Sequence, residues 1–154
     1  MRHNKAGFKL KRDVSARRAL LRNLVTSVIL EGRVITTVPK AKAAKPIVDQ
    51  IITLAKREKK EEQLHARRQA ASYLLTPASV QKLFDKVGPS MATRNGGYTR
   101  VVRVGFRKGD GAETAALELV NYELVRRAAD RAKRREEKLK ALQEGREGGE
   151  SAES

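Results

Sequence analysis

An excess of positive charge constrains this chain more than any other feature of its sequence. Lysine and arginine number 34 against 18 aspartate and glutamate residues, so the formal net charge is +16 and the isoelectric point is near 10.6. A chain with this charge repels itself unless a polyanion neutralises it. A nucleic acid is the polyanion that we expect, and a membrane surface is the alternative.

The sequence lacks the features of several other protein classes. No apolar run approaches the roughly 20 residues that span a bilayer, and the basic N-terminus is not followed by the apolar stretch of a signal peptide. There is no cysteine, which excludes disulfides and thiolate metal sites, and there are only two histidines. We therefore expect a cytoplasmic protein without a membrane partner, a metal, a cofactor or a small-molecule substrate.

The positive charge is concentrated before the C-terminal tail. Residues 126–154 contain nine Lys/Arg and seven Asp/Glu, a net charge of +2, which leaves +14 of the total of +16 for the preceding residues. Two stretches of that part are poor in acidic residues: residues 1–22, and residues 86–109, which contain no carboxylate. A single basic face would require the fold to bring these two stretches together.

Residues 1–12 form a basic arm in which no carboxylate balances the positive charge. Only Phe8 and Leu10 could anchor this arm, so on its own it buries too little apolar surface to offset its chain entropy. Cations on such a segment neutralise phosphates and release counterions, and a structured RNA offers grooves that an extended chain can enter. We therefore favour RNA binding over a solvated terminus, with contacts from Arg2, His3, Lys5, Lys9, Lys11 and Arg12.

Residues 13–122 predict a globular domain that begins with a helix. Asp13 and Ser15 are good N-cap residues, and Gly32 is a typical C-terminal stop. Apolar residues follow helical spacing between them, at Leu20, Leu21, Leu24, Val25, Val28 and Ile29. Another face of this helix carries Arg17, Arg18 and Arg22.

A strand and three further helices are expected next. Residues 33–38 are rich in β-branched residues and predict a short strand, after which Pro39 suits the first turn of a second helix. Pro46 inside this helix predicts either a kink or a later start. A third helix is expected over residues 62–75 and a fourth from residue 76 to a stop at Gly88-Pro89. The side chains of the third helix that are expected to face the core are Leu64, Ala71, Leu74 and Leu75.

The sequence then changes to a period of two. Residues 98–108 predict a strand, a glycine-rich turn follows at residues 109–111, and residues 114–122 predict its hairpin partner. One face of the first strand carries Val102, Val104 and Phe106, and one face of the second carries Ala115, Leu117 and Leu119. The strand at residues 33–38 should join them, because an isolated hairpin is only marginally stable. The expected fold class is α+β, with about four helices packed on a small three-stranded mixed sheet.

The composition changes again at residue 123. Residues 123–144 contain helix-forming residues without a broad apolar stripe, which predicts a solvated helix held by charge pairs one turn apart. Residues 145–154 are rich in Gly, Glu and Ser and are expected to be disordered. The predicted organisation is a basic arm at 1–12, a globular domain at 13–122 and a charged extension at 123–154.

The segment RNGGYTR at residues 94–100 is a second candidate RNA contact. Gly96 and Gly97 allow a partner to approach the backbone closely, and Arg94 and Arg100 are expected to contact phosphates. For Tyr98 two interpretations stay open, because its ring could stack on an unpaired base or lie in the core.

No compact group of residues indicates catalysis. Glu58, Glu61 and Glu62 lie beside two lysines, and a solvated charge run explains them better than a pair of catalytic carboxylates. His65 lies on a charged helix and is expected at the surface. We therefore expect no enzyme. A general nucleic-acid-binding protein of the nucleoid type is the alternative, although no helix carries the run of base-reading side chains that it would need.

Several segments resemble one bacterial ribosomal protein family. The chain opens with MRHNKAGFKL and continues with RALLRN at 18–23, TTVPKAK at 36–42, ITLAK at 52–56, KLF at 82–84, GGYTRV at 96–101, GFRKGD at 105–110 and LELV at 117–120. These segments resemble the family of large-subunit ribosomal protein seventeen in order and in spacing. The resemblance covers residues 1–122, and the shorter members of the family have no counterpart to the extension that follows.

This resemblance implies a mixed α/β domain that binds large-subunit ribosomal RNA beside neighbouring ribosomal proteins. It implies a place on the solvent side of the subunit, near the exit of the nascent-chain tunnel, and a structural role without catalysis or a cofactor. The family's N-terminal pattern falls on Arg2, His3, Lys5, Gly7 and Lys9, and its glycine turn on residues 94–100. The next expected RNA contacts are Arg17, Arg18, Arg22, Lys40 and Lys42.

Overall fold

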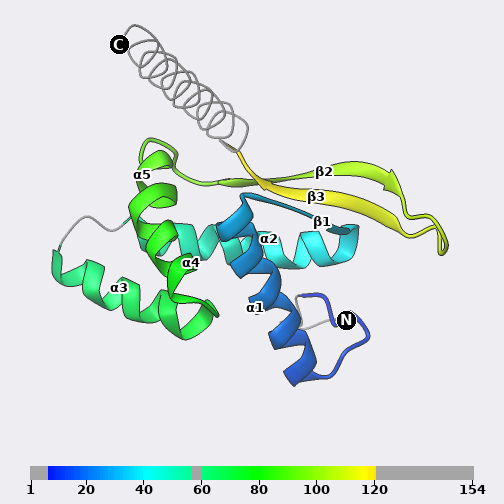
Figure 1. Cartoon of the computed structure of the whole chain (residues 1–154), viewed down its shortest axis with the longest axis horizontal. Helices are drawn as coiled ribbons and strands as arrows, with labels where there is room; N and C mark the ends of the chain where they lie inside the picture. The colour runs from blue at the N-terminus through cyan, green and yellow to red at the C-terminus, as the bar shows by residue number, and fades with distance from the viewer. Residues whose placement is uncertain (1–6, 57–59, 121–154) are drawn as a thin grey trace, which may run out of the picture. The chain divides into compact units, whose positions relative to one another are not determined.

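The computed structural model describes residues 7–56 and 60–120, which build four helical segments and three strands (Figure 1). These residues form an α+β fold, as the sequence predicts. The first six residues of the arm and the predicted extension from residue 123 lie outside the described residues. The boundaries of those two regions therefore stay predictions.

Helix α1 (Val14–Glu31) begins and ends where the sequence predicts. Asp13 precedes it in an extended conformation. Gly32 ends it with a φ of 79°, which glycine adopts without strain, and donates its N–H to the Val28 carbonyl at 2.8 Å. The predicted apolar stripe reaches the core at Val25, Val28 and Ile29, which are completely buried.

Strand β1 (Arg33–Thr37) leads directly into helix α2 (Val38–Ala55). Pro39 lies in the first turn of α2, where its missing N–H is not needed. Pro46 lies inside the helix, which continues on both sides of it, so this proline does not delay the start of α2. The buried face of α2 carries Ala41, Ala44, Val48, Ile51 and Ile52.

Helix α3 (Lys60–Tyr73) faces the core with a different side from the one predicted. Leu64, Ala71 and Leu75 are exposed, so that part of the prediction is wrong, and only Leu74 of the predicted set is buried. Ala66 and Ala70 are completely buried instead. Together with Leu74 they form a row spaced four residues apart, and their small side chains let the backbone of α3 lie close to its neighbours.

Helix α4 (Pro77–Lys82) continues through a π-helical turn, η1 (Leu83–Val87), into the short helix α5 (Gly88–Ser90). The predicted stop at Gly88-Pro89 is therefore wrong. The Gly88 N–H donates to the Leu83 carbonyl across the wide π turn, and Pro89 then falls in the first turn of α5, where no N–H is required. Gly88 serves close packing instead, because a Cβ at this position would lie 3.0 Å from the Ala55 carbonyl oxygen.

Strands β2 (Thr99–Phe106) and β3 (Glu113–Leu119) form the predicted hairpin, and β1 joins them in the order β1-β3-β2. Both neighbours run antiparallel to β3, so the sheet is antiparallel throughout and not mixed. Apolar matching favours this arrangement, because its register sets both Val34 and Val101 opposite Leu117. The predicted common face of Ala115, Leu117 and Leu119 is confirmed, because this part of β3 is regular strand and side chains two residues apart in a strand share a face.

A bulge between Arg103 and Gly105 breaks the predicted alternation in β2. Before the bulge Val102 pairs with Ala116, and after it Phe106 pairs with Glu113, so Val102 and Phe106 lie on opposite faces of the sheet. The prediction that Val102, Val104 and Phe106 share one face is therefore wrong. The extra residue is the cause, since a shift of one position reverses the face of every residue that follows.

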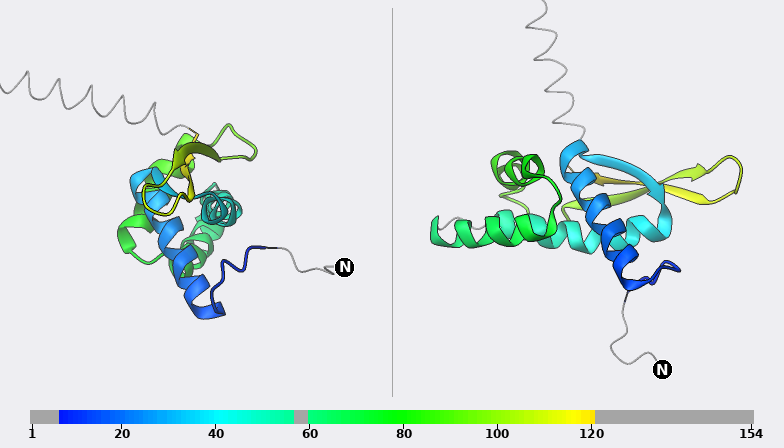
Figure 2. Two further views of the ribbon diagram at one scale, coloured as in Figure 1. Left: turned by 90° about the vertical axis from the view of Figure 1, so that its right-hand side faces the viewer. Right: turned by 60° about the horizontal axis from the view of Figure 1, so that its bottom comes forward.

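The helices cover one face of the sheet (Figures 1 and 2). Helix α2 contacts all three strands, and α1 and α3 pack against α2. The core between them includes the fully buried Ile29, Ile52 and Leu83, together with Leu117 of the central strand. On the opposite face the outer strands expose Ile35 and Val102, which are 61% and 41% exposed, whereas Ala116 and Glu118 of the central strand between them are buried.

Candidate nucleic-acid interface

Three segments enclose a groove of about 620 Å³, which we call the arm groove. They are the described part of the arm, the first half of α1 and the first half of α2, which lie side by side in Figures 1 and 2. Lys9, Arg17 and Lys42, one from each segment, line the groove. The fold therefore gathers three of the predicted RNA-binding cations in one place.

A turn at Leu10 and Lys11 folds the arm back toward the helices. Both residues have positive φ angles, 55° and 51°, which are unfavourable for residues with a Cβ. The Arg12 N–H donates to the Lys9 carbonyl at 3.2 Å within this turn. Asp13 follows, and a hydrogen bond from the Ser15 hydroxyl lowers the pKa of the Asp13 carboxyl. The turn thus places Lys9 against α1 and α2.

The cations of the arm groove have no acidic partner within residues 7–56 and 63–120. No ion pair joins Lys9, Arg17 or Lys42 to a carboxylate there. Phe8, which is 46% exposed, and Ile47 contribute apolar surface between the cations. Such a groove can bind phosphates through its cations and hold the face of a base or a sugar against its apolar surface.

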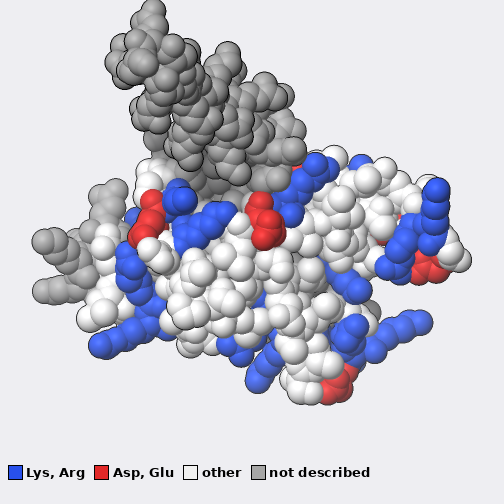
Figure 3. Space-filling model, viewed as in Figure 1, with Lys and Arg blue, Asp and Glu red and all other residues white. Residues whose placement is uncertain are grey.

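The other predicted cations of the same three segments do not line the groove. Lys11, Arg12 and Arg18 are exposed, and Lys40 is half-buried in the first turn of α2. Arg2, His3 and Lys5 lie outside the described residues. On the face shown in Figure 3, lysine and arginine outnumber aspartate and glutamate.

The apolar groove residues were not predicted as part of the site, namely Phe8, Leu21, Ala43, Pro46 and Ile47. Pro46 and Ile47 line the arm groove beside Lys42. An apolar residue that lines a groove has the same helical spacing as one that faces the core, so the sequence holds no signal that separates them. Lys9, Arg17 and Lys42 could be predicted as site residues, because cations without nearby acids are recognisable in the sequence.

Arg22 contacts the protein itself, although it was predicted to bind RNA. Its Nε donates to the Tyr73 carbonyl at 2.7 Å, and its Nη2 donates to the Ser72 carbonyl at 2.9 Å. The guanidinium also lies 5.9 Å from the centre of the Tyr73 ring. Arg22 therefore satisfies carbonyls at the C-terminal end of α3, where a positive charge is favourable.

The glycine loop, residues 94–97, presents backbone to the surface. Gly96 and Gly97 are exposed with φ angles of 145° and 61°, and no atom lies within 4 Å of a Cβ built on either. Arg94 is exposed, and its carbonyl accepts a hydrogen bond of 2.5 Å from Lys56 Nζ. Tyr98 is only 4% exposed, which supports the core interpretation of this residue over base stacking.

The arginines of the sheet are held by carboxylates. Arg33 and Arg100, on the two outer strands, both pair through Nε with Glu118 of the central strand, which is 4% exposed. Arg103 pairs with Glu113 at 2.9 Å, and Arg107 pairs with Asp110 in the hairpin turn. Residues 86–109 contain no acid in sequence, yet β3 and the turn supply one to each of these arginines.

The arm groove and the glycine loop are separate surfaces. Lys42 in the first half of α2 lines the groove, whereas Lys56 just after α2 contacts the loop. A helix rises 1.5 Å per residue, so these two positions are separated by roughly 20 Å along α2. The fold therefore keeps the glycine loop of the second acid-poor stretch apart from the arm groove.

The described residues contain no candidate metal site. His65 is exposed, and residues 7–56 and 60–120 contain no group of three His, Cys, Asp or Glu side chains that could hold a metal ion. No helix in the same part of the chain is long and apolar enough to cross a membrane.

Comparison with known proteins assigns the chain to a family. The family model of "Ribosomal protein L17" matches residues 20–120. A protein of Solibacter usitatus named "Large ribosomal subunit protein bL17" is 63% identical over 147 residues, which cover 96% of this chain and 95% of that protein. A protein of the same name from Koribacter versatilis is 52% identical over 149 residues, which cover 93% of this chain and 90% of that protein. The chain therefore belongs to the ribosomal protein L17 family.

Proposed function

We propose that this protein is a structural constituent of the large ribosomal subunit that binds large-subunit ribosomal RNA through its arm and arm groove. The observation that carries the proposal is that Lys9, Arg17 and Lys42 line one groove. Among the described residues, none of the three forms an ion pair with a carboxylate. The names of the relatives support the ribosomal assignment, since both are called large-subunit proteins.

The groove suits a folded RNA better than a regular duplex. Its cations come from three segments and enclose a recess, so a phosphate backbone would have to curve into it, as it does at junctions and loops of structured RNA. The residues before the groove add Arg2, His3 and Lys5, which continue the same basic arm. Lys11, Arg12, Arg18 and Lys40 are proposed as further phosphate contacts around the groove, because they belong to the same segments.

A second RNA contact is proposed at the glycine loop. Arg94 is exposed there, and the backbone of Gly96 and Gly97 is open to a close approach. Arg100 adjoins the loop and directs its Nε to Glu118, which fixes the orientation of its half-exposed guanidinium. We leave Arg22 and Tyr98 out of the proposed interface, because both are engaged within the domain.

The family resemblance also supports a finer placement. We propose that the protein lies near the exit of the nascent-chain tunnel, beside neighbouring ribosomal proteins, and that it holds RNA segments together during assembly and translation in the cytoplasm. No catalytic step is part of this role.

Sedimentation of a cell lysate through a density gradient, after a high-salt wash, tests the proposal. We expect the full-length protein to remain with large-subunit particles. The variant Arg2→Ala/Lys5→Ala/Lys9→Ala should incorporate poorly while keeping the circular dichroism spectrum of the wild type. The matched control Arg68→Ala/Lys86→Ala/Lys108→Ala removes three other cations, all exposed, and should incorporate normally. Recovery of the wild-type protein free, or with chromosomal DNA, would overturn the ribosomal assignment in favour of a nucleoid-type role.

A further inference from the structure

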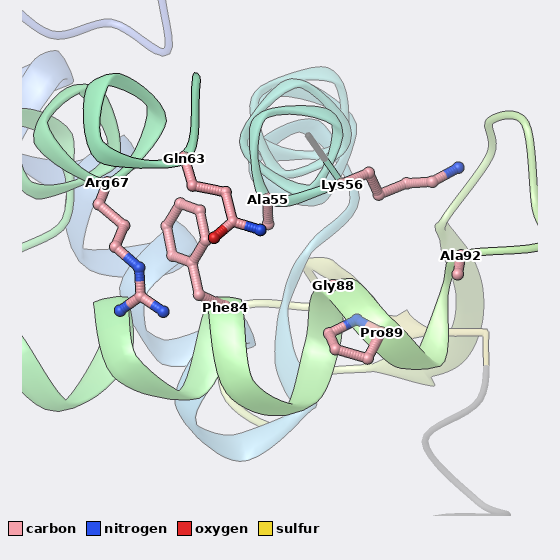
Figure 4. A pocket seen from close by; sticks show the side chains of 8 residues that line it. All are labelled: Ala55, Lys56, Gln63, Arg67, Phe84, Gly88, Pro89 and Ala92. Carbon is pink, nitrogen blue, oxygen red and sulfur yellow. The ribbon is translucent and has the colours of Figure 1, made fainter. Parts of the chain in front are cut away.

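A second cavity, of about 250 Å³, opens between the end of α2, the start of α3 and the η1–α5 segment (Figure 4). We call it the α2–α3 pocket. Its apolar lining consists of Ala55, Phe84, Gly88, Pro89 and Ala92, and its polar lining of Lys56, Gln63 and Arg67. None of these residues belongs to the arm groove, and none was predicted to bind RNA.

Two cations flank the apolar lining of this pocket. Arg67 lies over the Phe84 ring, with 4.8 Å between the guanidinium carbon and the ring centre, and its side chain is 45% exposed. In Figure 4 Lys56 lies on the other side of the pocket from Arg67 and directs its amine toward the loop beyond Ala92. Among the residues whose side chains the structure describes, no carboxylate lines the pocket, and Arg67 pairs at 3.4 Å with Asp85, which lies outside the lining.

We infer that the α2–α3 pocket binds a single unstacked nucleotide of RNA, with the base inside and the adjoining phosphates at Arg67 and Lys56. A planar base suits an apolar recess that is bounded on one side by an arginine stacked on a phenylalanine, because RNA-binding proteins hold unpaired bases against aromatic and guanidinium planes. The cations at the mouth complement phosphate and would repel a basic partner.

The pocket also adjoins a surface that is already proposed to contact RNA. Lys56 hydrogen-bonds to the Arg94 carbonyl, so the rim of the pocket is continuous with the glycine loop. A strand of RNA that passes the exposed backbone of Gly96 and Gly97 would therefore reach the pocket within a short distance. An acid-bearing protein side chain is the competing occupant, and continuity with the loop favours RNA.

The pocket has a defined shape before any ligand binds. Gly88 lets α5 pack directly against α2, since a Cβ there would lie 3.0 Å from the Ala55 carbonyl oxygen and 3.3 Å from its Cβ. Phe84 is 8% exposed and fixed beneath Arg67. A site whose lining is already ordered loses less side-chain entropy when it binds.

This inference rests on the proposed RNA binding and is tested separately from it. The full-length protein is bound to in vitro transcribed large-subunit ribosomal RNA, and the RNA is probed with dimethyl sulfate at unpaired bases and with hydroxyl radicals along the backbone. Arg67→Ala removes a cation of the pocket, whereas Ala92→Phe fills the pocket without changing the charge. Arg68→Ala is the matched control, because Arg68 is an exposed arginine on the same helix that does not line the pocket.

We expect the wild-type protein and Arg68→Ala to shield one or a few unpaired bases. Arg67→Ala and Ala92→Phe should restore those bases to the reactivity of free RNA and weaken binding on the order of 10-fold, while the backbone protection that depends on the arm persists. Identical base patterns for all four proteins would overturn the pocket inference and leave the proposed function standing. If the base patterns were unchanged but Arg67→Ala and Ala92→Phe sedimented less completely with large-subunit particles than the wild type, the pocket would hold a protein side chain and not a base. Absence of any protection by the wild type would instead refute the proposed function itself.

Discussion

The arm groove and the sheet both carry several cations, but they differ in how those cations are held. In the groove, Lys9, Arg17 and Lys42 have no acidic partner among the described residues. On the sheet and its turn, Arg33, Arg100, Arg103 and Arg107 each pair with a carboxylate. The difference teaches that a count of cations along the sequence does not measure the charge that a partner meets.

The difference arises from the cross-strand geometry of the sheet. Residues that lie opposite each other on neighbouring strands have their Cβ atoms about 5 Å apart, so a carboxylate on β3 reaches arginines on both sides. Glu118 lies opposite Arg33 on β1 and Arg100 on β2. No ion pair among the described residues engages Lys9, Arg17 or Lys42, so these cations stay available to a polyanion.

Removal of the groove cations should have the largest effect. The variant Lys9→Ala/Arg17→Ala/Lys42→Ala is expected to lose more than roughly 10-fold in RNA affinity, and the slope of log K against log salt should become less steep by about 2 to 3, since each phosphate contact contributes about 0.7–0.9. The control deletes two whole ion pairs of the hairpin, as Arg103→Ala/Glu113→Ala/Arg107→Ala/Asp110→Ala, and should bind almost as the wild type does. Filter binding across a salt series measures both. Equal losses of RNA affinity in the groove variant and in the hairpin control would contradict the contrast between the two regions.

Arg22 and Arg18 sharpen the contrast within a single helix. Arg22→Ala should lower the free energy of unfolding by about 2 kcal/mol, because it leaves two carbonyls at the end of α3 without a charged donor. Burial raises the pKa of Tyr73 and the charge of Arg22 opposes that rise, so the variant should raise the Tyr73 pKa further. Chemical denaturation and ultraviolet titration of tyrosine measure the two effects.

Arg18→Ala is the control for Arg22→Ala, because Arg18 is exposed one turn earlier on α1. It should leave stability and the Tyr73 titration unchanged and reduce only RNA affinity. If Arg22→Ala and Arg18→Ala were equally stable, the hydrogen bonds of Arg22 to the end of α3 would not contribute to stability.

Glu118→Gln probes the paired arginines of the sheet. The amide keeps the shape of the side chain but loses its charge, so Arg33 and Arg100 would face each other across an uncharged group. We expect a loss of about 1 kcal/mol in stability and little change in RNA affinity, because the added net positive charge offsets the less fixed orientation of Arg100. Thermal melts at low and high salt should show that the difference in stability between the wild type and Glu118→Gln becomes smaller as the salt concentration rises. A marked fall in RNA affinity would show that the paired arginines need Glu118 to present them to RNA.

The smallest effect is expected at the exposed hairpin turn. The hydrogen bonds from Arg107 lower the pKa of Asp110 to about 2 from an ordinary value of 3.8. Because the folded-state pKa is depressed, the pair contributes its stability above the unfolded-state pKa and loses it as the pH falls toward 2. A carboxyl titration followed by NMR should give a midpoint near 2 for Asp110 in the wild type and a higher midpoint in Arg107→Ala. If Asp110 had the same midpoint in the wild type and in Arg107→Ala, the ion pair would not form in solution.

The sequence predicted those parts of the fold that local signals specify. Gly32 and Pro39 mark the end of α1 and the start of α2, because their φ preferences act within one turn. The inward face of α3 and the continuation through Gly88-Pro89 were predicted wrongly, since both depend on contacts with other elements. Ala66 and Ala70 gave no hydrophobic signal of their own, and the bulge in β2 left no mark in an otherwise regular alternation.

The candidate site divides in the same way. Lys9, Arg17 and Lys42 could be predicted, because cations without neighbouring acids can be counted along the chain. Their convergence on one groove could not be predicted, and neither could the internal contacts of Arg22, whose partners lie about fifty residues away. The choice between core and surface for Tyr98 likewise needed the packing of the folded domain, in which this residue is 4% exposed.

The strand order also determines when the domain can be completed during synthesis. The central strand β3 is the last of the three to leave the ribosome that makes the chain, yet both β1 and β2 hydrogen-bond to it. Helices α1 to α5 all precede β3 in the chain and can form while the chain is still growing, whereas β1 has no partner strand until β3 has been made. A growing chain of this protein therefore carries a helical layer and two unpaired strands until the final strand arrives and closes the sheet in one late step.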